Sequence, residues 1–413
     1  MILVEEALRH ILEKIPRLGS ERVSILRALG RVLAEDILVS RNIPPWDNSA
    51  MDGYAVRGED ILTASKENPV ILWVLGDLPA GKVFQGRGSP GTAVRIMTGA
   101  PLPAGFDTVV PVEDTEKDAD RVKILANPGI GKNIRFSGED VKSGEWILQE
   151  GMLLRPAHIG MMASIQRSMV SVYQQPRVAI LSTGDELLEI DEPWAEGKIV
   201  NSNSYSLAAL VAESGGMPIQ LGIAKDRREE LAGKIQQGLV ADLLLTSGGV
   251  SVGDYDLVKE MLNELGRMNF WKVAMRPGQP LAFGMISEKP LFGLPGNPVS
   301  SMISFEQFVR PSILKMRGFK DLFRPTLRAI LREDISKKAG LVHFIRCRLI
   351  LEREKVFAST TGEQGSGILS SMVKAHGLIV LPRELTLARA GEVVKVILLD
   401  PSLFHLSAPP FFS

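Results

Sequence analysis

Apolar side chains recur at helical spacing near the N-terminus, at Val4, Ala7, Leu8, Ile11, Leu12 and Ile15. This pattern predicts an amphipathic helix that ends before Pro16. A second helical stretch is expected to reach about Asp36. The apolar pattern becomes helical once more from Leu154 to about Gln175.

Two other regions have a sequence pattern typical of β-strands. From residue 42 to 145, short apolar runs such as VILWVLGDLPAG, DTVVPVED and RVKILANPG alternate with Gly and Pro clusters. The same pattern returns from residue 321 to 413 in TLRAILRE, HFIRCRLILE, GLIVLP and VVKVILL. The first region is therefore predicted to be a β-rich domain, and the second a small β-barrel.

Between these regions, residues 176–320 alternate strand-like runs with helical runs of 10 to 15 residues. RVAILST, MPIQLGIAKD and DLLLTSGG are the strand-like runs that precede helical patterns. Such alternation predicts βαβ units and a mainly parallel sheet. Ligands bind beyond the carboxyl ends of such strands. The turns STGDE, AKD, TSGGVSVGDYD and LPGNPVS are therefore the places where a site is expected.

Taken together, the patterns predict a multidomain α/β plus β protein. Its expected parts are a split N-terminal helical and linker domain, a β-rich domain, a central α/β domain and a C-terminal barrel. They are assigned to residues 1–41 with 146–175, 42–145, 176–320 and 321–413.

The expected strand-end turns carry oxygen-bearing side chains, at Thr183, Asp185, Glu186, Asp226, Ser247, Ser251, Asp254 and Asp256. Any single acid at such a turn is most simply explained as a helix cap. As a set beside glycine-rich turns, they favour a site for Mg²⁺, which takes oxygen ligands and usually retains waters and substrate phosphates. Glycines there let backbone N–H groups approach an oxyanion closely.

Cationic residues follow in the segment KVAMRPGQP, which contains Lys272 and Arg276. LPGNPVS then ends in Ser300 at the start of a predicted helix, where backbone donors favour anions. A phosphorylated substrate and a second oxyanion are therefore plausible ligands. An exposed strand edge is the alternative explanation for the two cations, and periodicity does not distinguish the two.

Composition narrows the class of protein. The 413 residues carry 48 Lys and Arg against 48 Asp and Glu, so no overall positive field attracts nucleic acid or an anionic membrane. Cys347 is the single cysteine, which excludes an internal disulfide. The N-terminus lacks a basic leader followed by a long apolar run, and no uncharged apolar stretch is long enough to span a membrane. A cytoplasmic location is expected.

A competing motif is GxSxG, formed by Gly249, Ser251 and Gly253 after an apolar run. This arrangement would fit the nucleophile turn of a serine hydrolase. The neighbouring Gly248, with Asp254 and Asp256, instead favours an open loop that binds an anion through backbone N–H groups. A serine hydrolase is therefore the alternative enzyme class.

Several ordered motifs resemble one known family. They are DNSAMDGYAVR (47–57), RIMTGAPLP (95–103), SGED (137–140), STGDEL (182–187), NSN (201–203), SGGVSVGDYD (247–256), FWKVAMRPGQP (270–280) and LPGNPVS (294–300). The chain resembles the molybdopterin molybdenumtransferase family, which comprises the MoeA-type enzyme of bacteria and archaea and the E domain of gephyrin. The resemblance extends from the first helix to EQGSG and GLIVLP in the last β segment.

The resemblance implies a homodimer that joins adenylylated molybdopterin and molybdate with Mg²⁺ and releases AMP and molybdenum cofactor. It implies an active site between the β-rich domain of one subunit and the α/β domain of the other. The residues implied to be catalytic are Asp52, Thr98 and Asp140 from the first, and Glu186, Asp226 and Asp256 from the second. Of these, Glu186, Asp226 and Asp256 are the implied metal ligands. Substrate binding is assigned to Ser182, Thr183, Gly184, Asp185, Ser247, Gly248, Gly249, Ser251, Lys272, Arg276, Pro295, Pro298 and Ser300.

Candidate partners are the molybdopterin adenylyltransferase and the enzymes that accept the cofactor. Three positions depart from the family pattern: Arg276 replaces an expected Lys, Gln279 stands where Lys is frequent, and Arg227 follows Asp226 where a second acid is common. Molybdate and tungstate are not distinguished, because their size and charge are nearly the same. A non-catalytic dimeric scaffold of the gephyrin type also remains open.

Overall fold

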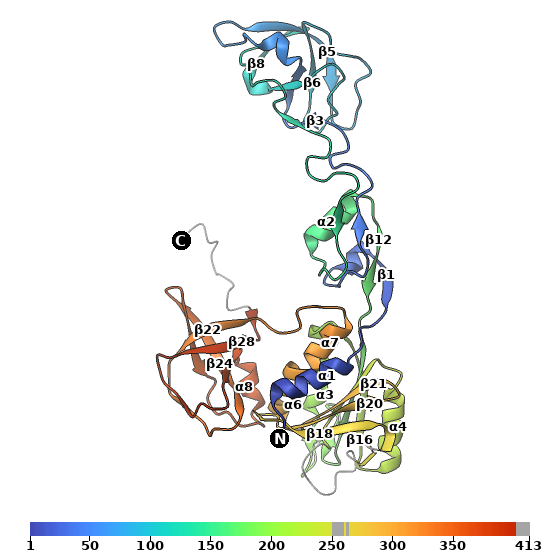
Figure 1. Cartoon of the computed structure of the whole chain (residues 1–413), viewed down its shortest axis with the longest axis vertical. Coiled ribbons are helices and arrows are strands. Elements are labelled where there is room, and N and C mark those ends of the chain that lie inside the picture. The colour runs from blue at the N-terminus through green and yellow to red at the C-terminus, as the bar shows by residue number, and fades with distance from the viewer. Residues whose placement is uncertain (250–259, 262–263, 402–413) are drawn as a thin grey trace. The chain divides into compact units, whose positions relative to one another are not determined.

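The computed structural model describes residues 1–249, 260–261 and 264–401. The chain forms two compact units, Val23–Val170 and Met1–Arg22 with Ser171–Ser413, which Figure 1 colours by residue number. The finer division into four domains stays a prediction.

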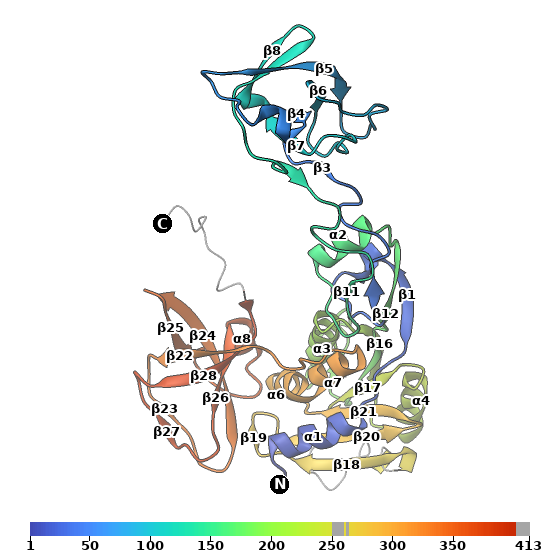
Figure 2. The ribbon, with the colours of Figure 1, turned by 45° about the horizontal axis from the view of Figure 1, so that its top comes forward.

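The unit of residues 23–170 is built mainly from strands, as its Gly- and Pro-punctuated apolar runs predicted. Its main sheet has the order β7-β4-β6-β5-β9-β8 (Figure 2). These strands are β4 (Gly53–Val56), β5 (Val70–Leu78), β6 (Thr92–Ile96), β7 (Thr108–Pro111), β8 (Thr115–Asp118) and β9 (Arg121–Ile124). Buried side chains of alternating strand positions, including Tyr54, Val56, Leu72 and Val110, form its core.

Short elements complete this unit. Strand β2 (Ile37–Leu38) pairs with β11 (Trp146–Leu148), and β3 (Asn48–Ser49) pairs with β10 (Ile134–Arg135). Further elements of this unit are the 3₁₀ turns η2 (Gly58–Ile61) and η3 (Val112–Asp114), and the helix α2 (Pro156–Ser164).

The helical predictions were correct at α1 (Val4–Lys14) and α2, but the second helical stretch was wrong. That segment forms β1 (Ser20–Ser24) and the 3₁₀ turn η1 (Ile25–Ala28). β1 pairs with β12 (Met169–Tyr173), which lies within the last predicted helical stretch. Leu26 is 79% exposed, so the apolar stripe of a helix here would bury little. Strand pairing supplies the backbone hydrogen bonds instead.

The α/β domain contains one sheet of order β16-β13-β17-β21-β20-β18 (Figure 2). Its strands are β13 (Arg177–Thr183), β16 (Met217–Ala224), β17 (Leu243–Ser247), β18 (Arg267–Lys272), β20 (Pro280–Ile286) and β21 (Lys289–Leu294). β16, β13, β17 and β21 run parallel, whereas β20 is antiparallel to both of its neighbours. The short strands β14 (Leu187–Leu188) and β15 (Ile199–Val200) pair beside it.

Helices cover both faces of this sheet. Buried residues of α1, α3 (Ser202–Glu213), α6 (Pro298–Ser304) and α7 (Arg310–Met316) share one cluster with Val178 and Ile180. Leu231 and Ile235 of α4 (Arg228–Gly238) pack with the alternate residues Ala179 and Leu181 on the other face. A π-helical turn, η4 (Phe305–Val309), joins α6 to α7.

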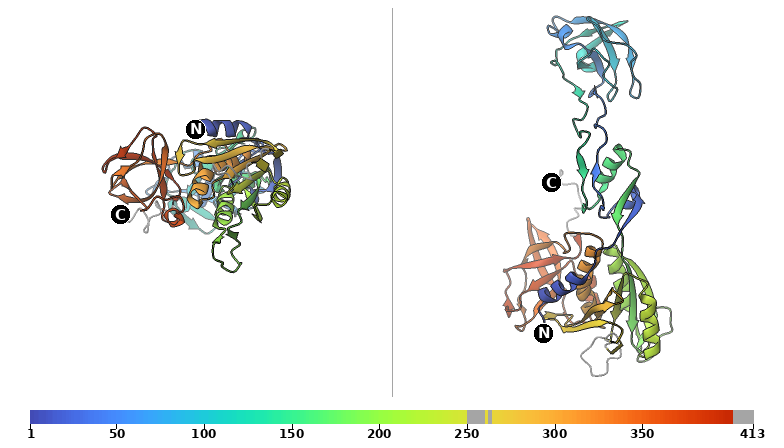
Figure 3. Two further views of the ribbon diagram at one scale, coloured as in Figure 1. Left: turned by 90° about the horizontal axis from the view of Figure 1, so that it is seen from below. Right: turned by 45° about the vertical axis from the view of Figure 1, so that its right-hand side comes forward.

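The C-terminal domain is a closed barrel, drawn in orange and red in Figure 3. β24, β25, β22, β28 and β26 follow one another, and pairing of β26 with β24 closes the ring. Their bounds are β22 (Thr326–Leu331), β24 (Val342–Glu352), β25 (Lys355–Thr360), β26 (Gly377–Leu381) and β28 (Val393–Leu398). Smaller elements are β19 (Met275–Arg276), β23 (Ile335–Ser336), β27 (Leu387–Ala388) and α8 (Leu369–Val373).

The predicted fold class, α/β with additional β domains, is therefore confirmed. Within the described ranges, every helix is too short or too polar to cross a membrane.

Candidate active site

The carboxyl ends of four strands of the α/β sheet lie at one edge. The parallel registers pair Thr183 with Ala224, Ser182 with Ser247, and Ser247 with Leu294. The turns that follow these strands therefore start side by side, as expected for a ligand site in an open α/β sheet. They carry the predicted residues Gly184 to Glu186, Asp226, Gly248 and Gly249, and Pro295.

Close backbone packing at this edge requires Gly248. Its φ is +92°, and a Cβ atom there would lie 2.8 Å from the Thr183 carbonyl oxygen. The Gly248 N–H donates to the Leu294 carbonyl at 3.1 Å. Gly249 also has a positive φ, of 64°. These conformations suit glycine and keep the turn free of side-chain bulk.

Three carboxylates gather beside this turn. The Asp226 N–H donates to Asp185 Oδ1 at 3.3 Å. A Cβ atom added to Gly184 would come within 2.4 Å of Glu186 Oε2, so this carboxylate folds back over the turn. Burial and the charges of Asp185 and Glu186 raise the pKa of Asp226. A bound cation would relieve this repulsion.

Other predicted residues of this loop cannot be placed. Ser251, Gly253, Asp254 and Asp256 lie outside the described residues. In the described part of the chain, no group of three or more His, Cys, Asp or Glu side chains is arranged to hold a metal ion. The metal-ligand set that includes Asp256 therefore stays a prediction, as does the alternative role of Ser251 as a nucleophile.

Some polar side chains next to the strand-end turns are hydrogen-bonded within the protein, and others have unpaired atoms. The Ser182 hydroxyl donates to Asn201 Oδ1 at 2.9 Å, and Asn201 caps α3 through the Ser204 N–H. Asn203 Nδ2 donates to Ser247 Oγ at 2.8 Å and to the Gly296 carbonyl at 2.7 Å. Within the described residues, Thr183 Oγ1 and Asn203 Oδ1 are buried without a hydrogen-bond partner. These two oxygens are unsatisfied polar atoms next to the strand-end turns.

The predicted cations lie on different elements. Lys272 ends β18, which points the same way as β21 because both are antiparallel to β20. Lys272 is exposed at the edge of the sheet where the strand-end turns lie. Arg276 is also exposed, but its short strand β19 pairs with β24 of the barrel, opposite His343. The sheet alone therefore does not bring the two cations together.

The start of α6 contains Pro298 and Ser300. Pro298 is the first helical residue, which suits a residue without an N–H. Ser300 is buried, with 5% of its surface exposed. The Val299 N–H donates to the Ser366 carbonyl of the barrel at 3.1 Å, so this helix-end donor is already paired. The barrel loop of residues 362–367 therefore lies at α6.

Arg346 organises this barrel loop, and no site role had been predicted for it. Its side chain is 1% exposed and donates to Ser371 Oγ and to the Gly365 carbonyl, both at 3.0 Å. Burial lowers its pKa to about 10. An arginine inside the apolar run HFIRCRLI was the available signal, because a buried cation requires hydrogen-bond partners.

The unit of residues 23–170 holds the remaining predicted site residues. The backbone N–H and the hydroxyl of Thr98 both donate to Asp52 Oδ1 at 2.7 Å. These hydrogen bonds, the backbone one first, lower the pKa of Asp52. The side chain of Asp140 is exposed, and its N–H donates to the Ile43 carbonyl at 3.0 Å. Asp52 and Thr98 thus form one hydrogen-bonded pair.

Family models match most of the chain. Residues 2–165 match the MoeA N-terminal region (domain I and II), residues 179–315 a probable molybdopterin binding domain, and residues 328–399 the MoeA C-terminal region (domain IV).

Similar proteins span nearly the whole length. A molybdopterin molybdenumtransferase of Haemophilus influenzae is 38% identical over 401 residues, which cover 96% of this chain and 98% of that protein. A protein of the same name from Nostoc is 38% identical and covers 95% and 93%, respectively. The crystal structure of a molybdopterin biosynthesis MoeA protein from Pyrococcus horikoshii has a TM-score of 0.82 at 33% identity, covering 96% of this chain and all of that chain.

Proposed function

Because the chain belongs to the MoeA family of molybdenum cofactor biosynthesis enzymes, we propose that it inserts molybdate or tungstate into adenylylated molybdopterin and releases AMP. Mg²⁺ is the proposed cofactor. Adenylylated molybdopterin and the metal oxyanion are the proposed substrates. The homodimer and the cytoplasmic location expected from the sequence stay predictions.

The observation that carries this proposal is the pair of unpartnered oxygens at the sheet edge. Thr183 Oγ1 and Asn203 Oδ1 are buried and unpaired in the described part of the chain. Leaving a buried polar group without a partner costs about 1–3 kcal/mol. A polar ligand that hydrogen bonds to both would recover this cost. The site therefore suits a ligand rich in donors and acceptors, as a pterin nucleotide is.

The acids of the strand-end turns are the proposed ligands of the divalent cation. Burial, followed by the charges of Asp185 and Glu186, raises the pKa of Asp226. Carboxylate oxygens are the ligands that Mg²⁺ prefers. Because the described acids alone do not form a three-ligand group, we include a further ligand from residues 250–259. Glu186 and Asp226 would hold the ion, with Asp256 as the further proposed ligand. When bound, Mg²⁺ would supply positive charge that stabilises the phosphate oxygens of departing AMP.

The remaining residues would bind and orient the substrates. The positive φ angles of Gly248 and Gly249 give this turn a conformation in which backbone N–H groups can bind an oxyanion. Lys272, exposed at the same edge, would contribute positive charge toward a phosphate or molybdate. The hydrogen bonds from Thr98 lower the pKa of Asp52, so this carboxylate is suited to accept a hydrogen bond from the substrate in its ionised form.

The test follows AMP release from adenylylated molybdopterin with Mg²⁺ and molybdate or tungstate. Absence of AMP release from the wild-type chain would contradict the proposal and favour a non-catalytic scaffold. Thr183→Val keeps the shape of the side chain and removes only the unpaired hydroxyl. We expect the KM for adenylylated molybdopterin to rise by up to about tenfold, the equivalent of one hydrogen bond.

Ser182→Ala is the matched control on the neighbouring residue. It removes a hydroxyl that already donates to Asn201, so, in contrast to the substrate-binding role that the resemblance implies for Ser182, we expect a small loss of stability and an unchanged KM. Equal KM values for the Thr183→Val variant and the wild type would show that the unpaired hydroxyl does not bind this substrate.

A further inference from the structure

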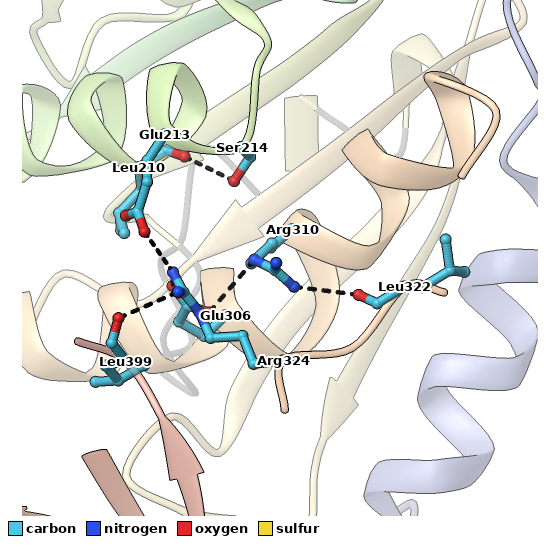
Figure 4. A network of polar contacts seen from close by, with 8 residues as sticks. All are labelled: Leu210, Glu213, Ser214, Glu306, Arg310, Leu322, Arg324 and Leu399. Carbon is cyan, nitrogen blue, oxygen red and sulfur yellow. Dashed lines mark hydrogen bonds and ion pairs between the residues drawn. The ribbon is translucent and has the colours of Figure 1, made fainter. Parts of the chain in front are cut away.

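A buried ion-pair network joins the helices of the α/β domain to the barrel (Figure 4). Its centre is Glu306, whose side chain is only 4% exposed and lies in the π-helical turn η4. Arg324 donates through Nε to Glu306 Oε2 at 2.7 Å and through a terminal nitrogen to Oε1 at 2.9 Å. This bidentate geometry fixes both the orientation of the guanidinium relative to the carboxylate and the distance between them.

Arg324 has two further partners. It donates to Glu213 Oε1 at the end of α3 at 2.9 Å, and to the Leu399 carbonyl at 3.3 Å. Burial opposes the charge of Arg324, but its hydrogen bonds to Glu306 and Glu213 raise its pKa. The guanidinium therefore remains charged. Arg310 Nε lies 4.0 Å from Glu306 Oε2, so breaking the Glu306–Arg324 pair would leave each charge with one charged partner fewer: Glu306 would keep Arg310, and Arg324 would keep Glu213.

Arg324 lies where the chain passes from the α/β domain into the barrel. Arg324 lies in the segment between α7 and β22, where the chain enters the barrel, and Leu399 follows β28, where it leaves. The Leu398 N–H also donates to the Pro325 carbonyl at 3.0 Å. Both ends of the barrel chain are thus attached to helices of the α/β domain through one side chain.

The barrel contacts the same helical segment a second time. α6, η4 and α7 are continuous from Pro298 to Met316. Ser366 of the barrel accepts a hydrogen bond from Val299 at the start of this segment, while Arg324 holds Glu306 in its middle. Movement of the barrel about Arg324 would therefore displace residues 362–367 from the start of α6.

We propose that Glu306 and Arg324 are positioning residues that fix the barrel on the α/β domain and so hold residues 362–367 at α6. The alternative role is a local one, in which the pair only stabilises the helical turn that contains it. The proposal concerns the placement of the barrel and does not depend on the proposed metal insertion.

Hydrogen exchange of the full-length protein distinguishes the two roles. Glu306→Gln retains the shape of the side chain and removes its charge. Arg324→Lys retains the charge but cannot form the bidentate pair with Glu306. We expect exchange of the Val299 amide, which donates to Ser366, to accelerate by about tenfold or more in both variants. Exchange of the Leu314 amide in α7 and the Leu245 amide in β17 should not change.

The matched control is Glu352→Gln, which breaks the exposed Arg332–Glu352 pair within the barrel and should leave Val299 exchange unaltered. Unchanged Val299 exchange in Glu306→Gln and Arg324→Lys would overturn the proposal. So would an equal acceleration at Leu314, because that pattern indicates loss of local helix stability. If Glu306→Gln does not fold, Arg324→Lys provides the same test.

Discussion

Replacing Gly248 by Ala should destabilise the sheet edge for two separable reasons. At a φ of +92°, an L-residue costs about 1–2 kcal/mol relative to glycine. The new Cβ would also lie 2.8 Å from the Thr183 carbonyl oxygen and 3.1 Å from Thr183 Oγ1. Because the carbonyl belongs to β13 inside the sheet, it has little room to move. Such overpacking adds about 1–3 kcal/mol.

Gly222→Ala separates the two costs. Gly222 lies in β16 of the same sheet with a φ of +76°, and its added Cβ would have only ordinary contacts, the nearest at 3.6 Å to Glu189 Oε1. This control should therefore show the conformational cost alone. Both substitutions reduce the entropy of the unfolded chain equally, so that contribution cancels in the comparison.

The assay is native-state hydrogen exchange of the Leu244 and Leu245 amides in β17, the strand that precedes Gly248. Gly248→Ala should lower their opening free energy by about 1–3 kcal/mol more than Gly222→Ala does, which is roughly five- to 150-fold in exchange rate. Equal protection in the two variants would refute the close approach of Gly248 to Thr183 as the reason for glycine at this position.

Three further predictions concern single side chains. Thr98→Val should raise the pKa of Asp52 toward its ordinary 3.8 in an NMR titration, because one of two hydrogen bonds to the carboxylate is lost. Because the folded-state pKa of Asp52 is lowered, the hydrogen bond from the Thr98 hydroxyl stabilises the fold above pH 3.8, and this stabilisation is lost as the pH falls through the lowered pKa. An unchanged Asp52 pKa in Thr98→Val would contradict the prediction. Asp185→Asn should lower the pKa of Asp226, as should added Mg²⁺, and no shift in either case would argue against a shared cation site. Burial raises the pKa of Cys347 to about 12, so a thiol reagent should label it only as fast as the barrel opens; rapid labelling of the folded protein would contradict its burial.

Several residues of the candidate site were predicted from their positions relative to the predicted strands. Asp226 and Glu186 were predicted because each follows an apolar strand-like run, and parallel strands bring such ends to one edge. The structure places both there, where burial and then the charges of Asp185 and Glu186 raise the pKa of Asp226. Which of the hydroxyls there is paired within the protein was not predictable. Ser182 and Thr183 are adjacent in the sequence but point to opposite faces of β13, and Asn201 pairs with only one of them.

Periodicity was also insufficient where an element depends on a distant partner. Residues 20–28 fit a helical pattern equally well, and pairing of β1 with β12 determines the strand. Periodicity likewise did not predict that β26 pairs with β24 to close the barrel, or that β19 pairs with β24.

The sequence by itself determined the amphipathic first helix, the alternation of strands and helices in the α/β domain, and the family. These depend on residues within one turn, one strand or one short motif. Only the tertiary structure decided which polar atoms remain unpaired, that Arg346 is buried, and that Arg324 reaches Glu306, Glu213 and the Leu399 carbonyl. A hydrogen bond or an ion pair requires two groups within about 3 Å. For groups far apart in the chain, packing of the whole domain sets that distance.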